Sequence, residues 1–256
     1  MSVGYELLGA RGLAVDLNGT RILHDITLAI EPGERVAIVG PNGAGKTTLM
    51  RALSGALPAA AGEVILCSEP ITNLTRETIA HSIAVVGAGI SLPFSTRVDD
   101  LVALGRIPHG RGPRGATAHD RERVAAAIER VGAVHLVDRD VRTLSAGERQ
   151  LVLIALGLAQ ETPILALDEP TAHLDLRHRL EIADLLSSLA SDETIMKTKR
   201  TIVAIFHELD LVREHFTRVL LVANGTIIGD GRPASVLTAP QISEAWGIPL
   251  KRAAQL

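Results

Sequence analysis

The apolar residues follow strand-like patterns near both ends of the chain. Ile26, Leu28 and Ile30 occupy every second position, the period of a strand that buries one face. The pairs Asn18-Gly19 and Asn224-Gly225 have the composition of tight hairpin turns. We therefore expect antiparallel strands in the first stretch of the chain and a final hairpin close to its C-terminus.

Short continuous apolar runs, each about the length of a buried strand, recur between these ends. They cover residues 35–39, 64–67, 83–86, 164–167, 201–206 and 219–222. From about 99 to 160 the pattern is mainly helical, with Val124, Ile128 and Val131 spaced to share one helix face. Within it, 108–119 is rich in Gly, Pro and Arg, which predicts a surface loop. This order favours an α/β core with a helical insertion.

The composition narrows the class of protein. The 256 residues suffice for one large domain, and with 46% apolar but only 2% aromatic residues its core must be aliphatic. A net charge of −3 gives no attraction to nucleic acid, and the single Cys67 excludes a disulfide framework. No apolar stretch approaches the ~18 residues of a membrane span, and the N-terminus lacks a signal-peptide pattern. We expect a soluble cytoplasmic protein.

A glycine-rich loop after the apolar run 35–39 carries the strongest chemical signal. It consists of Gly40, Pro41, Asn42, Gly43, Ala44, Gly45, Lys46, Thr47 and Thr48. In such a P-loop, backbone N–H groups surround phosphate oxygens at the positive end of the following helix. Lys46 would reach the β- and γ-phosphates, and the Thr47 hydroxyl would bind Mg²⁺. A chance match is the alternative, but the flanking strand and helix favour a nucleoside triphosphate site.

A second signal lies where the predicted strand 164–167 ends in Asp168 and Glu169. Such an end lies at the carboxyl edge of a parallel sheet, where the P-loop also opens. Asp168 suits Mg²⁺, and Glu169 suits the polarisation of an attacking water. His207 follows the run 201–206 and would contact the γ-phosphate at the same edge. The alternatives are a plain strand end before a turn and a structural histidine.

A third signal is the start of a predicted helix at Ser145. Ser145 with Glu148 three residues later forms a capping box, which needs no function beyond the helix itself. The functional interpretation uses the same geometry. A helix N-terminus entered through the small residues Ala146 and Gly147 is an anion site.

In this order, the segments resemble the nucleotide-binding subunits of the ATP-binding cassette (ABC) family over essentially the whole chain. The matching segments are Gly40–Thr48 (Walker A), Leu144–Gln150 (signature), Ile164–Glu169 (Walker B), Ala172–Asp175 (D-loop) and His207 (switch histidine). The resemblance implies one α/β domain, a P-loop NTPase core with an antiparallel β subdomain and a helical insertion subdomain. The core would be 1–87 and 161–256, and the helical subdomain roughly 88–160.

The resemblance also implies a head-to-tail homodimer in which ATP lies between the Walker motifs of one subunit and the signature of the other. The resemblance implies that Glu169 and His207 are catalytic and that Thr47 and Asp168 bind Mg²⁺. It also implies that Asp175 makes a dimer contact. The signature residues that would contact the partner's ATP are Ser145, Ala146, Gly147 and Glu148. Neither subunit alone would hold a complete site, so hydrolysis would require the pair.

Weaker sequence similarities point to one group within the family. The stretches 92–109 and 236–249 are similar to those of ATPases that serve iron–siderophore, haem and cobalamin importers. This resemblance implies integral-membrane permease partners, a separate substrate-binding protein and a place on the cytoplasmic face of the membrane. Two alternatives stay open, a soluble cassette ATPase in a non-transport process and a nucleotide-binding regulatory module with impaired turnover.

Two positions depart from the family pattern. Ala88 stands where the family has a glutamine that touches Mg²⁺ and the attacking water, so weak basal hydrolysis or altered coupling is our hypothesis. Leu17 stands where relatives stack an aromatic ring on adenine.

The basic cluster of Arg106, His109, Arg111 and Arg114 is expected to be a solvated loop, with a position near the permease as the alternative.

Overall fold

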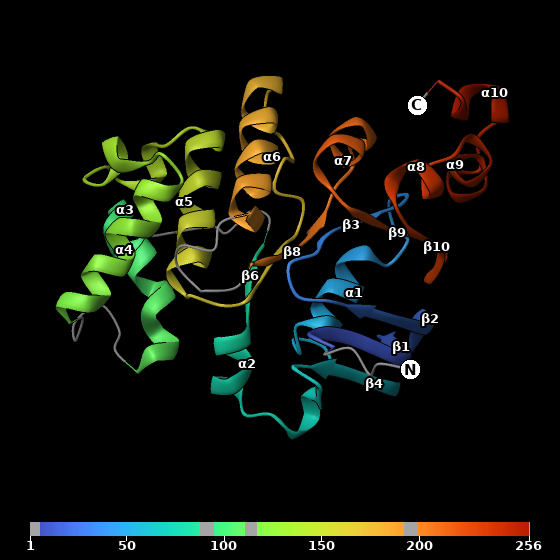
Figure 1. Ribbon diagram of the computed structural model, residues 1–256, viewed down its shortest axis with the longest axis horizontal. Helices are drawn as coiled ribbons and strands as arrows, with labels where there is room; N and C mark the ends of the chain where they lie inside the picture. Colours follow the sequence, from blue (N-terminus) through green and yellow to red (C-terminus); the bar gives the residue numbers. More distant parts are fainter. Residues whose placement is uncertain (1–5, 88–94, 111–116, 192–198, 256) are drawn as a thin grey trace.

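Two β-sheets form the frame of the molecule (Figure 1). The computed structural model describes residues 6–87, 95–110, 117–191 and 199–255. The first sheet contains, in spatial order, β2 (Thr20–Ile30), β1 (Leu8–Leu17), β4 (Ala61–Leu66) and β5 (Glu69–Pro70), all antiparallel. The second contains β10 (Thr226–Gly231), β9 (Arg218–Ala223), β3 (Arg35–Val39), β8 (Thr201–Ile205), β7 (Ile164–Leu167) and β6 (Ile83–Val86).

The second sheet is parallel from β9 to β6, and only β10 runs antiparallel to its neighbour β9. Strands β6 and β7 have the bounds that their apolar runs predict. Because the strands are parallel, the carboxyl ends of β3, β7 and β8 lie at one edge of the sheet. The segments that follow these three strands are therefore brought together from distant parts of the chain.

The helices connect and cover the sheets. They are α1 (Lys46–Leu53), α2 (Arg76–Ser82), α3 (Val98–Ala103), α4 (Ala118–Arg130), α5 (Ala146–Ala159), α6 (Leu176–Ser191), α7 (Leu209–His215), α8 (Pro233–Val236), α9 (Ala239–Trp246) and α10 (Leu250–Ala253). The 3-10 helices are η1 (Ile71–Asn73), η2 (Leu104–His109), η4 (Val134–Leu136) and η5 (Val141–Thr143). None of the helices in the described ranges combines the length and the apolar character that a membrane span requires.

Both predicted hairpin turns are present. The positive φ angles of Asn18 (50°) and Gly19 (76°) suit the turn between β1 and β2, and those of Asn224 (49°) and Gly225 (73°) the turn between β9 and β10. Residues 64–66 of the predicted apolar run lie in β4, which pairs with β1 and so extends the antiparallel sheet, whereas Cys67 follows the end of the strand.

The aliphatic core consists of two clusters that share the second sheet. On β3, Val36 and Ile38 belong to the cluster beneath the antiparallel sheet, whereas Ala37 and Val39 belong to the cluster that packs against α5, α6 and α7. The alternation arises because successive side chains of a strand point to opposite faces. All four side chains are fully buried, so β3 is fixed from both sides and holds the P-loop that follows it.

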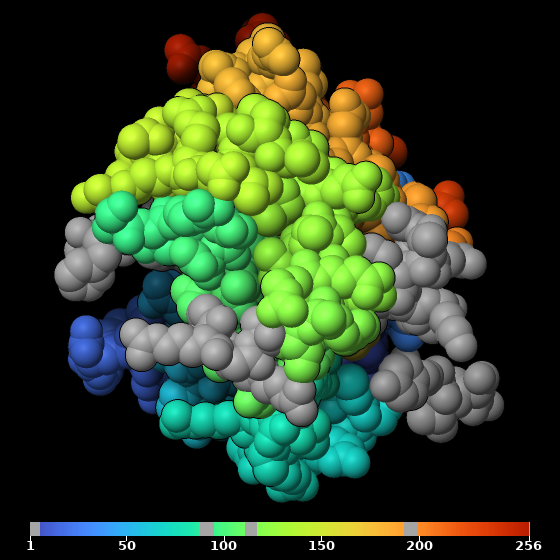
Figure 2. Space-filling view, turned by 90° about the vertical axis from the view of Figure 1, so that its left-hand side faces the viewer, coloured from blue at the N-terminus to red at the C-terminus, as the bar shows by residue number. Residues whose placement is uncertain are grey.

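Helices α3, α4 and α5 form a group at one side of the two sheets (Figure 1). Figure 2 views this side, where the green residues of the group lie above the cyan residues around α2. The apolar residues Val124, Ile128 and Val131 of the predicted helix are all buried, with Val131 just after the end of α4. We propose that this group is the helical subdomain, with boundaries near residues 88 and 160.

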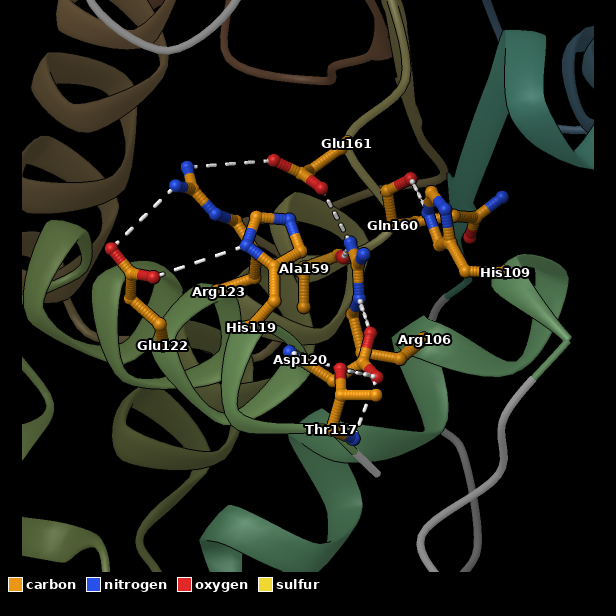
Figure 3. A network of polar contacts seen from close by, with 10 residues as sticks. All are labelled: Arg106, His109, Thr117, His119, Asp120, Glu122, Arg123, Ala159, Gln160 and Glu161. Carbon is orange, nitrogen blue, oxygen red and sulfur yellow. Dashed lines mark hydrogen bonds and ion pairs between the residues drawn. The ribbon is translucent and has the colours of Figure 1, made fainter. Parts of the chain in front are cut away.

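The expectation of a solvated loop is wrong at Arg106, which lies in η2 and is only 3% exposed. Its Nε donates a hydrogen bond to Asp120 Oδ1 at 3.1 Å. Its Nη1 donates to the carbonyl oxygen of Ala159 at 2.7 Å and to Glu161 Oε2 at 2.6 Å (Figure 3). A buried cation needs charged and hydrogen-bonding partners. Because these partners come from α4 and from the end of α5, the guanidinium joins both helices to η2.

His109 is also held in place, with Nε2 3.1 Å from the carbonyl oxygen of Gln160 (Figure 3). Its ring also packs edge-on against His81 of α2 at 4.7 Å between centroids. Arg111 and Arg114 lie outside the described residues. The predicted loop 108–119 is shorter than expected, since α4 already begins at Ala118.

Candidate nucleotide site

The glycine-rich loop runs from the end of β3 to the start of α1 in a conformation that its sequence dictates. Gly40 has φ 151°, and a Cβ there would lie 2.0 Å from the carbonyl oxygen of Val222 on β9. Gly45 has φ 101° and meets Leu23 of β2 at 2.8 Å in the same way. Only glycine fits both positions. The loop thereby enters α1 at Lys46, where the free N–H groups of the first turn form an anion site.

Lys46 is 5% exposed, and its Nζ donates to the carbonyl oxygens of Gly40 at 2.9 Å and Pro41 at 2.8 Å. Burial lowers the pKa of its amine, while the carboxylates of Glu169 and Asp168 act in the opposite direction. These direct partners of the ammonium are neutral carbonyl oxygens, so a phosphate group would offer it stronger, charge-assisted hydrogen bonds.

Thr47 and Asp168 approach each other across the gap between α1 and β7. The Thr47 hydroxyl donates to Asp168 Oδ1 at 3.2 Å. Burial raises the pKa of Asp168, the Thr47 hydrogen bond opposes this shift, and the neighbouring Glu169 carboxylate adds to it. No cluster of three or more His, Cys, Asp or Glu in the described ranges forms a protein-only metal cage. A hydroxyl and a carboxylate oxygen fit Mg²⁺, which takes its other ligands from water and phosphate.

Glu169 and His207 follow the neighbouring parallel strands β7 and β8, so their side chains meet at the carboxyl edge of the sheet. His207 Nε2 lies 2.8 Å from Glu169 Oε1. Because a carboxylate only accepts hydrogen bonds, Nε2 carries the proton in this pair. Both side chains are about one third exposed, at 38% for His207 and 33% for Glu169, which leaves them accessible to a ligand.

These residues surround a cavity of about 710 Å³. Its lining consists of Leu17, Ile22, Asn42, Gly43, Gly45, Lys46, Thr47, Thr48, Glu169, Ala172, His173 and His207. The structure thus brings the P-loop together with Glu169 and His207, and Asp168 reaches the site through Thr47. Leu17 and Ile22 give the cavity an aliphatic wall, and its lining residues include no Phe, Tyr or Trp.

The signature residues have a different position. Ser145 caps α5: its Oγ accepts from Glu148 N at 3.2 Å, and Glu148 Oε2 accepts from Ser145 N at 2.8 Å, which confirms the predicted capping box. Ser145 and Glu148 line a separate groove of about 850 Å³ between α5 and α6. The lining of the P-loop cavity, all of it in the described ranges, includes neither Ala146 nor Gly147.

Asp175 also lies away from the P-loop cavity, directly before α6, with a side chain that is 66% exposed. Ala88 and the nearby Ser91 lie outside the described residues. Two residues before Ala88, the carbonyl oxygen of Val86 accepts a hydrogen bond from Asp168 N at 2.9 Å.

Sequence reasoning missed two histidines. His173 lines the P-loop cavity; it lies within the predicted D-loop segment, which was matched for a contact between subunits and not for this cavity. His178 contacts Asp175 at 2.8 Å and packs against Gly147. The spacing Asp-x-x-His, which is typical of a helix start, was a usable signal for its contact with Asp175. Its contact with Gly147 depends on tertiary structure alone.

The chain resembles known proteins over most of its length. A cobalamin import ATP-binding protein from Halobacterium salinarum is 40% identical over 239 residues, which are 93% of this chain and 58% of that relative. The chain thus spans a little more than half of that protein. A hemin import ATP-binding protein from Nocardia farcinica is 38% identical over 253 residues, 97% of this chain and 85% of the relative.

The structural comparison gives the same family. A chain of a metal-chelate type ABC transporter in an inward-facing conformation superimposes with a TM-score of 0.82 at 26% identity, covering 95% of this chain and 90% of the other. This confirms the expected α/β fold. Residues 23–172 match the family described as ABC transporter. The chain therefore belongs to the ABC transporter family.

Proposed function

We propose that the protein is the ATP-binding and ATP-hydrolysing subunit of a membrane importer. The observation that carries this proposal is the cavity at the carboxyl edge of the sheet, where Lys46 and Thr47 of the P-loop face Glu169 and His207. A positive loop, a hydroxyl that can bind Mg²⁺ and a carboxylate that can orient water are groups that P-loop enzymes use for phosphoryl transfer, and His207 adds a donor for the γ-phosphate. The importer assignment draws on the names of the two relatives.

In this proposal the P-loop residues from Gly40 to Thr48 bind the phosphates. Lys46 exchanges its two carbonyl partners for phosphate oxygens, because charge-assisted hydrogen bonds are stronger than those to neutral carbonyls. Thr47 and Asp168 hold Mg²⁺. When bound, Mg²⁺ supplies neutralisation of the phosphate charge that develops during transfer.

The chemical step falls to Glu169 and His207. Glu169 orients a water for in-line attack at the γ-phosphorus and accepts its proton. The Nε2–H of His207, which donates to Glu169 at 2.8 Å, turns to a γ-phosphate oxygen when the nucleotide binds. The pair therefore links nucleotide sensing to the general base.

We further propose that the working form is a homodimer. Ser145, Ala146, Gly147 and Glu148 lie outside the cavity of their own chain, so they are free to close the site of a partner subunit. The N-terminus of α5, capped by Ser145, offers N–H groups to the partner's γ-phosphate. Asp175, exposed before α6, is placed for a contact between the two subunits.

The proposed partners follow from the same family assignment. They are integral-membrane permease subunits and a separate substrate-binding protein, with this chain peripheral on the cytoplasmic face of the membrane. The proposed cargo is a metal chelate such as an iron chelate, haem or cobalamin, in keeping with the names of the relatives. Nucleic acid is not among the proposed partners, since the net charge is −3.

MgATP hydrolysis over a series of protein concentrations tests the enzymatic part. We expect turnover to rise more steeply than linearly with protein, because the complete site needs two subunits. Glu169→Gln should abolish it, while the matched variant Glu63→Gln, a half-exposed carboxylate on β4, should not change it. Hydrolysis that stays proportional to protein concentration where ultracentrifugation finds only monomer would contradict the composite site.

A separate experiment tests the importer assignment. The tagged chain is purified from detergent-solubilised membranes of cells that produce it at native level. We expect it to copurify in a stable ratio with an integral-membrane protein. Recovery only from the soluble fraction, alone or with translation components, would favour the non-transport ATPase instead.

A further inference from the structure

His178, in the first turn of α6, makes two hydrogen bonds to one atom. Its backbone N–H donates to Asp175 Oδ1 at 2.9 Å, the usual capping contact for the third residue of a helix. Its ring Nδ1 lies 2.8 Å from the same oxygen. Because the carboxylate only accepts, Nδ1 carries the proton, and the ring is fixed in one tautomer and one orientation. The hydrogen bonds from His178 also lower the pKa of Asp175.

The other edge of this ring packs on the signature glycine. A Cβ added at Gly147 would lie 2.2 Å from Cδ2 and 2.6 Å from Cγ of His178, far closer than real Cβ atoms come to any neighbour. The ring could relieve that overlap only by rotating away, which would break its bond to Asp175. Gly147 therefore has a local reason to be glycine, within its own chain.

A capping role alone does not account for this arrangement. Capping of α6 uses the backbone N–H of residue 178, which almost any residue supplies. The ring bond to Asp175 and the contact with Gly147 are additional, and they need an imidazole. The ring also lies beside the capped start of α5, since His178, Ser145 and Glu148 line one groove. It therefore bridges the starts of two helices from different parts of the fold.

We propose that His178 is a positioning residue that joins the D-loop carboxylate Asp175 to the signature glycine Gly147. The inference rests on the proposed function, in which both segments act on the partner subunit. If they are joined through a rigid ring, they reach the partner as one unit, and a displacement of one is transmitted to the other. The ring is not among the residues that line the P-loop cavity of its own chain.

A double-mutant cycle tests the link. The readout is ATP-dependent dimerisation, measured by analytical ultracentrifugation in the Glu169→Gln background, with thermal melts to verify folding. Gly147→Ala should weaken dimerisation about tenfold, because the new methyl displaces the ring. In the same background, Gly147→Ala combined with His178→Ala should recover the level of His178→Ala alone, since the smaller side chain makes room for the methyl.

His178→Asn is the conservative control. Its amide keeps an N–H donor for Asp175 but still places an atom near the former Cδ2 position. On its own it should stay within about threefold of the parent, and it should not rescue Gly147→Ala. Rescue by His178→Ala but not by His178→Asn is a pattern that loss of helix capping does not produce.

The experiment distinguishes failure of the His178 link from failure of the proposed function. If Gly147→Ala is equally harmful with and without His178→Ala, its methyl acts only on the partner's nucleotide, and the link is overturned while the proposed dimer stands. If the Glu169→Gln parent itself does not dimerise with ATP, the proposed function is overturned and the link with it.

Discussion

Asp168 illustrates at the scale of one residue how a site can cost stability. Burial raises its pKa, so the folded chain binds the carboxyl proton more tightly than the unfolded chain does. The stability that this carboxyl contributes is therefore lost as pH rises from its unfolded-state pKa, about 3.9, through its higher folded-state pKa. The loss persists at neutral pH. Under the proposed function, the charge would serve to hold Mg²⁺ beside Thr47.

From this we predict opposite effects of Asp168→Asn on stability and activity. The amide keeps an acceptor for Thr47 and removes the buried charge, so the melting temperature of the nucleotide-free protein at pH 7 should stay the same or rise. ATP hydrolysis should fall at least about 100-fold, since a lost metal ligand removes several kcal/mol of transition-state stabilisation. Asp210→Asn, on an almost fully exposed residue of α7, should change neither quantity. A marked fall in melting temperature would contradict the assignment.

At the scale of elements, the Arg106 cluster ties the start of α4 to the end of α5 (Figure 3). Asp120 accepts from Thr117 N at 2.9 Å in the capping box of α4 and from Arg106 Nε at 3.1 Å. Hydrogen bonds from Thr117 and then from Arg106 hold the pKa of Asp120 well below its ordinary value. Asp120 thus contributes stability above the unfolded-state pKa, and the contribution is lost as pH falls toward the folded-state value.

Asp120→Asn should therefore lower the urea midpoint of unfolding at pH 7 and at pH 5. The difference from wild type should shrink below about pH 4, where the unfolded carboxyl begins to protonate. Glu122→Gln, an exposed neighbour on the same helix, is the matched control and should show little difference at any pH. A gap that stays constant down to pH 3.5 would mean that Asp120 stabilises through packing and not through its charge.

The same elements show how far sequence patterns reach. The strands β6 and β7, both hairpin turns and the capping box of α5 were predictable, because their signals lie within a few neighbouring residues. The burial of Arg106 was not, because its partners Asp120, Ala159 and Glu161 come from other elements and make a basic residue tolerable inside. Composition alone favoured a solvated loop.

In the nucleotide site, too, some features were predictable from local sequence and others were not. The P-loop and the Asp168-Glu169 pair are local patterns, and parallel topology accounts for their meeting at one sheet edge. The direct bond between His207 and Glu169 and the packing of His178 on Gly147 depend on side-chain geometry across separate elements. No pattern within a single element encodes such contacts.

At the scale of the whole molecule, the positions of the two half-sites have a testable consequence. The P-loop cavity and the groove at Ser145 are separate in one chain. In the proposed homodimer, a complete site would therefore combine the cavity of one subunit with the signature of the other. Lys46→Ala should disable the first half. Ser145→Asp should disable the second, because its carboxylate repels phosphate. It should leave α5 intact, since aspartate caps helices as well as serine does.

Each variant alone should therefore be almost inactive, yet a mixture of the two should hydrolyse ATP. In a mixed pair, the intact cavity of the Ser145→Asp subunit faces the intact signature of the Lys46→Ala subunit, and the second site carries both defects. An equimolar mixture forms mixed pairs half of the time, so about one quarter of all sites are complete if pairing is random. A hydrolysis rate up to this fraction of wild type is expected once the subunits have exchanged without nucleotide. A mixture no more active than its better component would show that each chain completes its own site, and the separation of cavity and signature would then need another explanation.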